Sequence, residues 1–158
     1  MANLFLKLSN GVNGESADDK HEKWIDLDSF HWGASQPAAI RGGGVAAGQA
    51  SFHDLTCVAK IDAAYPDVLN KCADGTHFDK IQIEGVKAGG SKLVYLKIDL
   101  NEVLVTSVDV NGAQGADVMV SYSFQGSKLG TTYVPQTKSG GAGAAIGPKN
   151  WDIKKQSK

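Results

Sequence analysis

The sequence has few cysteines, no marked excess of positive or negative charge, and no long apolar run. Its two cysteines, Cys57 and Cys72, fall in a strand pattern and on an apolar helix face, which favours buried free thiols over a disulfide or a redox pair. Sixteen basic and 17 acidic residues leave a net charge of −1, with no basic excess for binding nucleic acid or an anionic membrane. No apolar run approaches the roughly 18–20 residues of a membrane span, so we expect no membrane insertion. The first eight residues lack a basic segment followed by an apolar stretch, so we expect a protein made in the cytosol without a signal peptide.

Glycine, by contrast, is abundant, and its 19 residues imply the many turns and bends of an all-β protein. The 158 residues, 42% of them hydrophobic, fit a single domain, 1–158, with a substantial core. Apolar alternation predicts strands over 3–8, 24–32, 49–61, 78–86, 93–110, 117–125 and 129–134. Within 93–110 the alternation changes phase twice, which predicts a bulge or bend at each change.

One helix is predicted, because Pro66 suits a first helical position and Gly75 suits a C-terminal stop. Between them an apolar stripe recurs at helical spacing, formed by Tyr65, Val68, Leu69 and Cys72. The whole pattern predicts a mainly β fold, a closed or nearly closed β-barrel or sandwich of about eight strands, with one short α-helix packed on its side.

The segment from Trp24 to Pro37 begins as a strand, and the rest of the chain is organised around it. Side chains alternate along a strand, so Ile25 and Leu27 should share one face and Trp24, Phe30 and Trp32 the other. Large apolar groups on both faces predict a strand covered on one side by the core and on the other by a second surface. Pro37 should then take the chain out of the sheet.

A second strand, 117–125, alternates cleanly. Val118, Val120, Tyr122 and Phe124 should face the core. The outward row is small and mostly polar, comprising Met119, Ser121, Ser123 and Gln125. This row fits either a solvated face or the wall of a channel shared between subunits, and the pattern alone leaves both open.

Two glycine-rich segments show neither the apolar alternation of a strand nor the apolar repeat of a helix. Residues 35–48 contain Gly42-Gly43-Gly44, which would be costly to order in a helix or strand, so a long loop is predicted there. Ile40, Arg41 and Val45 could anchor this loop on a partner. Residues 138–158 are predicted to be a flexible C-terminal segment with a short anchor at Trp151.

Chemistry-bearing residues do not form a recognisable catalytic set. None of the four histidines stands at metal-ligand spacing from another histidine or from a cysteine. The pair His53-Asp54 has no nucleophile visible beside it, and the triple glycine lacks the Lys-Ser/Thr that follows a phosphate-binding loop. We therefore expect no catalytic residues, no metal site and no cofactor.

The most specific motif is Phe-x-Trp-Gly-x-Ser-Gln-Pro over residues 30–37. Other pieces follow in order along nearly the whole chain: Leu6-Lys7-Leu8, Gly14-Glu15-Ser16, His21, Phe52, Lys60, Asp62 to Pro66, Ser107-Val108, Tyr133 and Trp151-Asp152. Together they resemble the haemolysin-coregulated protein (Hcp) family, the tube subunit of type VI secretion. One departure is Tyr65, where a small hydroxyl residue able to cap the helix is expected.

The resemblance implies a small β-barrel with one helix, similar in architecture to phage tail-tube proteins. It implies that six copies close into a ring around a channel and that rings stack into a tube with a spike protein at its tip. A contractile sheath around the tube would propel it out of a Gram-negative cell, so the subunit would be cytoplasmic before firing and secreted afterwards. Small effector proteins would be carried and protected in the channel.

The resemblance also implies roles for three groups of residues. Subunit packing is expected from Phe30, Trp32, Gly33, Ser35, Gln36 and Pro37. Ring stacking is expected from Ile40, Arg41, Gly42, Gly43, Gly44 and Val45. Channel lining is expected from Met119, Ser121, Ser123 and Gln125.

Two other classes of function stay open. A monomeric β-barrel that binds a small ligand or carbohydrate would run near the mass of one chain, whereas a ring subunit would run at a multiple of it. An enzyme is disfavoured by the missing catalytic set, and activity lost on replacing His53 or Asp54 would revive it.

Overall fold

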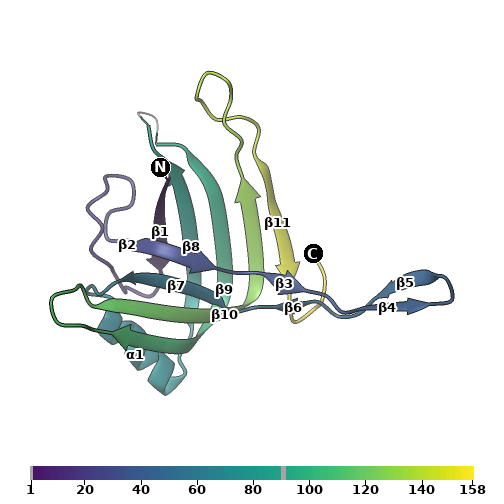
Figure 1. The fold of residues 1–158 in the computed structure, drawn as a ribbon, viewed down its shortest axis with the longest axis horizontal. Coiled ribbons are helices and arrows are strands. Elements are labelled where there is room, and N and C mark those ends of the chain that lie inside the picture. The colour runs from purple at the N-terminus through teal and green to yellow at the C-terminus, as the bar shows by residue number, and fades with distance from the viewer. Residues whose placement is uncertain (1, 90–91) are drawn as a thin grey trace.

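The computed structural model describes residues 2–89 and 92–158 and forms eleven strands and one helix (Figure 1). The elements are β1 Ala2–Leu8, β2 Ile25–His31, β3 Ala34–Ser35, β4 Ala38–Arg41, β5 Gly44–Ala47, β6 Ser51–Phe52, β7 Leu55–Lys60, α1 Tyr65–Asp74, β8 Phe78–Lys87, β9 Val94–Asn111, β10 Met119–Tyr133 and β11 Ile146–Asp152. The helix is not long and apolar enough to cross a membrane, and no other helix occurs in these residues.

Six of the strands close into a barrel, which confirms the predicted fold class. Their order is β10-β7-β2-β1-β8-β9, and antiparallel pairing between β9 and β10 completes the circle. Six strands are enough to close the barrel because β9 and β10 are long and bend, so that each forms two parts of the barrel's circumference. Strand β11 is added along the second half of β10.

The two phase changes predicted in 93–110 are present, although the strand is continuous. Near the first change Glu102 adopts a φ of 51°, a left-handed conformation that bends the strand. At the second, the pairing of β9 with β10 slips by one residue between Ser123 and Phe124. The segments 117–125 and 129–134, predicted as separate strands, are one strand, β10, because both lie along the bent β9.

The core fills the barrel and continues onto the helix. Buried aromatic and aliphatic side chains meet inside it, among them Leu6, Ile25, Phe78, Tyr122 and Phe124. Helix α1 starts with a proline in its first turn and ends at Gly75, whose φ of 73° fits a left-handed C-cap, as predicted. Of the predicted stripe, Val68 is fully buried, Tyr65 and Cys72 pack partly against the core, and Leu69 is exposed.

Strand β2 corrects a prediction about the central segment. Its pairing with β7 slips by one residue between Leu27 and Ser29, which is a β-bulge. Phe30 consequently lies opposite the buried Cys57 and packs against the barrel core, as does Trp32. The prediction that these two aromatic residues lie on the face opposite Leu27 is wrong, since one extra residue reverses the alternation. The inference that β2 is apolar on both faces depended on that prediction and is therefore wrong as well.

Both glycine-rich segments also contain strands. Residues 38–47, predicted as loop, form the hairpin of β4 and β5, in which Arg41 pairs with Gly44. Gly42 and Gly43 have φ values of 55° and 86°, the positive values of a two-residue type I′ turn. The glycines therefore make the turn of a hairpin. In 138–158, predicted to be flexible, β11 pairs with β10 from Ile146 onward.

Candidate interaction surfaces

The sheet of β9, β10, β7 and β2 has one face that points away from the barrel interior, and we call it the outer wall. On β10, alternate residues are buried, and the row Met119, Ser121, Ser123 and Gln125 faces outward as predicted. Their direct neighbours on β7 are Lys60, Val58 and Thr56, and on β9 they are Asn111, Asp109 and Ser107. Strand β2 adds Ser29 and His31. The outer wall is therefore a continuous surface of mostly small and polar side chains.

Charge on the outer wall is concentrated at one end. The middle is neutral, and there the hydroxyls of Thr56 and Ser123 lie 3.1 Å apart in a hydrogen bond. At the end where β2 begins and β7 finishes, exposed carboxylates occur at Asp26, Asp28, Asp109 and Asp117. Lys60 Nζ lies 3.2 Å from an Asp117 carboxylate oxygen. The wall thus has a neutral centre and an acidic end.

The outer wall is flanked by two sheet edges that have no strand partner among the described residues. Beyond Phe78, which pairs with Val103, β8 no longer accompanies β9, so residues 104–111 are hydrogen-bonded to β10 alone. On the opposite side, β1 pairs with residues 25–27 of β2, and residues 28–31 pair with β7 alone. Leu104 and Val110 on the first edge are exposed. Unpaired strand edges are templates for pairing with another chain.

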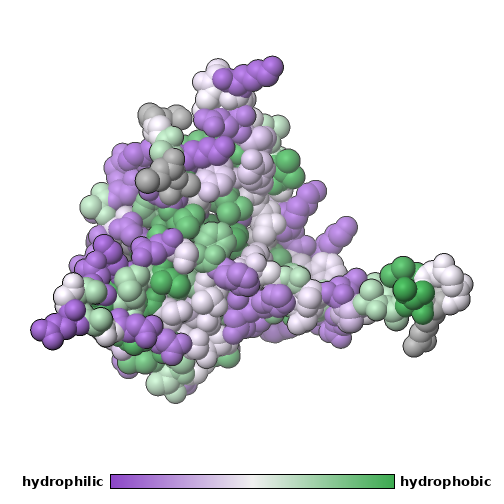
Figure 2. Space-filling view, in the orientation of Figure 1, coloured by the Kyte–Doolittle hydropathy of each residue, from purple (hydrophilic) through white to green (hydrophobic). Residues whose placement is uncertain are grey.

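The β4–β5 hairpin projects from the body of the molecule (Figure 1). Ile40 and Val45 face each other across its two strands and are 83% and 75% exposed. Figure 2 shows this hydrophobic tip standing clear of the barrel. A two-stranded hairpin is marginally stable on its own, so such an apolar tip is expected to gain stability from a partner. The side chain of Arg41 lies outside the part of the chain that the structure describes.

The motif over residues 30–37 forms the base of this hairpin. The rings of Trp32 and Phe52 stack with 6.4 Å between centroids, and Ser35 pairs with Ser51 across β3 and β6. The backbone N–H of Gly48 donates to the Pro37 carbonyl oxygen at 2.8 Å. Of the other predicted packing residues, Gly33 has its carbonyl bound by the His53 N–H and Gln36 is exposed. The contacts described here are within the chain, and the subunit packing expected of this motif stays a prediction.

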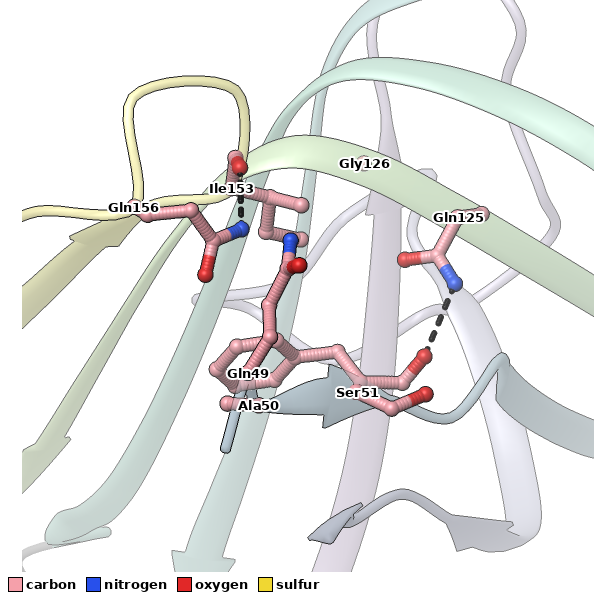
Figure 3. A pocket seen from close by; sticks show the side chains of 8 residues that line it. Gln49, Ala50, Ser51, Gln125, Gly126, Ile153 and Gln156 are labelled. Atoms are coloured by element: carbon pink, nitrogen blue, oxygen red, sulfur yellow. Dashed lines mark hydrogen bonds between the residues drawn. The ribbon is translucent and has the colours of Figure 1, made fainter. Parts of the chain in front are cut away.

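Beside the hairpin base lies an open hollow of about 520 Å³ (Figure 3). Its lining is amide, hydroxyl and apolar groups from Gln49, Ala50, Ser51, Phe52, Gln125, Gly126, Ile153 and Gln156. Gln125 donates to the Phe52 carbonyl oxygen at 3.0 Å, and Gln156 donates to that of Ile153 at 2.6 Å. Two of its amide groups are thus already engaged in holding the C-terminal segment and β6 in place.

The pair His53-Asp54, weighed as a catalytic candidate, has structural partners. Asp54 accepts hydrogen bonds from Thr106 Oγ1 at 2.7 Å and from Gln125 Nε2 at 3.1 Å. The carboxylate thereby ties the turn before β7 to β9 and β10. Within residues 2–89 and 92–158, no group of three or more His, Cys, Asp or Glu side chains is arranged to hold a metal ion.

A buried ionic network around His21 was not predicted. The imidazole is 2% exposed, stacks on Phe5, and places Nδ1 2.9 Å from Asp18 and Nε2 2.8 Å from Glu84. The hydrogen bond from His21, followed by that from Lys92, lowers the pKa of Asp18 to about 2. The sequence places Asp18 three residues from His21, but Glu84 is 63 positions away, and only the fold brings it in. The network fastens loop 9–24 onto the barrel.

Comparisons with known proteins point in one direction. A family model described as "Type VI secretion system effector, Hcp" matches residues 5–133. The protein hcp1 of Pseudomonas aeruginosa is 33% identical over 154 residues, which cover 96% of this chain and 94% of that protein. A solved structure described as a type six secretion system protein superposes with a TM-score of 0.94 at 29% identity, covering 99% of both chains. Hcp1 from Salmonella typhimurium gives a TM-score of 0.79 at 27% identity, covering 99% of this chain and 97% of its own.

Proposed function

The chain belongs to the Hcp family of type VI secretion proteins, a structural family of that secretion system, and on this premise we propose that it is a subunit of the secretion tube. Six copies close into a ring, and rings stack into a tube that carries small effector proteins in its channel. A spike protein caps the tip and a contractile sheath surrounds the tube. The subunit is cytoplasmic until the sheath contracts and is then secreted by that contraction.

Ring closure is supported by the two unpaired edges that flank the outer wall. A ring requires a head-to-tail contact in which one side of a subunit meets the other side of its neighbour. Residues 104–111 of β9 and 28–31 of β2 lie at opposite sides of one sheet, as such a contact needs. Pairing them between neighbours removes both edges and continues the sheet around the ring. This arrangement of edges is the observation that carries the proposal.

The channel surface follows from the same arrangement. If neighbouring sheets are continuous, one face of the combined sheet lines the channel, and the outer wall is the face not occupied by each subunit's own core. The row Met119, Ser121, Ser123 and Gln125 then lies in the channel lining. Small polar side chains suit a channel that holds folded proteins without trapping them on apolar patches.

Stacking is assigned to the hairpin. Its strands are exposed on both faces, and its tip carries the two most exposed large apolar side chains of the described chain, Ile40 and Val45. Inserted into an adjacent ring, this tip would bury apolar area that the isolated subunit leaves in water.

The test is the mass of the purified protein by light scattering behind a sizing column. A ring gives about six times the 16.6 kDa of one chain. Val110→Lys, which puts a charge beside the β9 edge, should shift the mass toward one chain. Ile146→Lys makes the same kind of change on the exposed strand β11 and should leave the ring intact.

The opposite result for these two variants would move the ring contact from β9 to β11. A wild-type mass near one chain, even at high concentration, would refute the ring. The hollow beside Gln49 would then become the first place to look for a small ligand or carbohydrate.

A further inference from the structure

The hairpin tip carries the only arginine of the sequence, Arg41. It is the last residue of β4, directly before the two-glycine turn, and it follows the exposed Ile40. A guanidinium group makes bidentate hydrogen bonds with carboxylates, and it is less strongly hydrated than the ammonium group of lysine. The tip therefore combines an exposed apolar pair with the kind of cation that suits a contact with carboxylates.

An acidic hollow lies at the other end of the outer wall. Its volume is about 390 Å³, and its lining is Glu15, Asp26, Asp28, Lys60, Ile61 and Asp62. Four of these six residues are carboxylates, and Lys60 has a carboxylate partner outside the hollow, Asp117. Burial raises the pKa of Asp62, and the nearby charges of Glu15 and Asp26 act in the same direction. Negative charge in the hollow thus exceeds what its own lysine offsets.

The hairpin and the acidic hollow lie at opposite ends of the molecule along its long axis. Figure 1 shows β2 starting and β7 ending on the side away from the hairpin, and these are the strand ends that bear Asp26, Asp28 and Lys60. In a head-to-tail stack, such opposite ends of successive subunits come together. Ile61, which is 42% exposed in the hollow, offers an apolar surface to the apolar tip.

We propose that the hairpin of one copy docks in the acidic hollow of a copy in the next ring, with Arg41 facing the carboxylates of Asp26 and Asp28. This rests on the proposed tube and specifies the contact that orders its rings. The charge match admits one stacking direction, because hairpin against hairpin or hollow against hollow brings like charges together.

Three variants test the contact, with ring mass from light scattering and tube content from pelleting and negative-stain electron microscopy. Arg41→Glu should keep the ring and lose tubes, by roughly tenfold or more in the pelleted fraction, because the reversed charge recurs at every subunit of the ring. Asp28→Lys should do the same. The double variant should recover tubes through the exchanged pair. Lys138→Glu, an equal charge change on another exposed loop, is the control and should stack as wild type does.

Each outcome decides a separate point. Absence of rings from the wild-type protein contradicts the proposed function itself. Normal stacking by rings of Arg41→Glu or of Asp28→Lys would overturn the docking contact and leave the ring standing. A double variant that recovers no tubes would do the same. Wild-type rings that never associate at any concentration would also overturn it. Tubes should shorten as salt is raised while ring mass holds, since exposed charge pairs are screened.

Discussion

The β4–β5 hairpin allows a substitution that separates local from global stability. Gly42 and Gly43 have φ values of 55° and 86° in the turn. A residue with a side chain pays roughly 1–2 kcal/mol in a left-handed conformation, and a β-branched residue is the least suited to it. Gly43→Val should therefore lower the ratio of closed to open hairpin by about 5–30-fold. The hairpin is only marginally stable, so this is enough to open it in most molecules.

Gly43→Val should leave the stability of the barrel unchanged. The described side chains of β4 and β5 are exposed and none belongs to the core. The free energy of unfolding of the barrel should accordingly change by no more than a surface substitution does, about ±0.5 kcal/mol, and the melting temperature should stay nearly unchanged. Gly42→Asn is the matched control, because asparagine tolerates positive φ and Asn-Gly is the preferred type I′ sequence.

Hydrogen exchange of the hairpin amides, read beside thermal melting, measures both quantities. Faster exchange at Ile40 and Val45 in Gly43→Val, with unchanged melting and an unaffected Gly42→Asn, is the expected result. Equal amide protection in both variants would show that the turn does not hold the hairpin. A lower melting temperature would show that the hairpin unfolds together with the barrel.

Three further predictions concern the barrel. Tyr122→Phe should stabilise the fold by about 1–3 kcal/mol, because the buried Tyr122 hydroxyl has no hydrogen-bond partner in the described structure; a lower melting temperature would reveal a partner. The lowered pKa of Asp18, caused by His21 and Lys92, means that its contribution to stability is complete above its usual value of 3.8 and is lost as the pH falls toward 2; Asp18→Asn should flatten acid unfolding over that interval. Ser121→Glu should alter effector co-purification while leaving melting unchanged, and unaltered co-purification would place Ser121 outside the channel.

Predictions that depended on neighbouring residues succeeded. The inward and outward positions of β10 follow from alternation over a few residues, and the ends of α1 follow from Pro66 and Gly75. The two bends of β9 were visible as phase changes because a strand that changes phase must bulge or bend.

Predictions failed where local patterns are ambiguous. The bulge in β2 has no signal in the alternating pattern of the sequence, so alternation alone predicts the wrong face for Phe30. The prediction of a loop over 35–48 is wrong for 38–47 because the two hairpin strands are rich in alanine and carry no apolar alternation. Paired glycines between such strands are a hairpin signal only if the flanking residues are known to pair.

The sequence by itself determined the all-β class, the helix and the outward row of β10, since those depend on contacts between residues close along the chain. Its motifs also pointed to the Hcp family. Only the tertiary structure decided how the barrel closes between β9 and β10, which edges remain unpaired, and that Glu84 meets His21 from 63 positions away. Such features depend on pairing between distant segments, and the register of that pairing is fixed by the packing of the whole core rather than by any one strand.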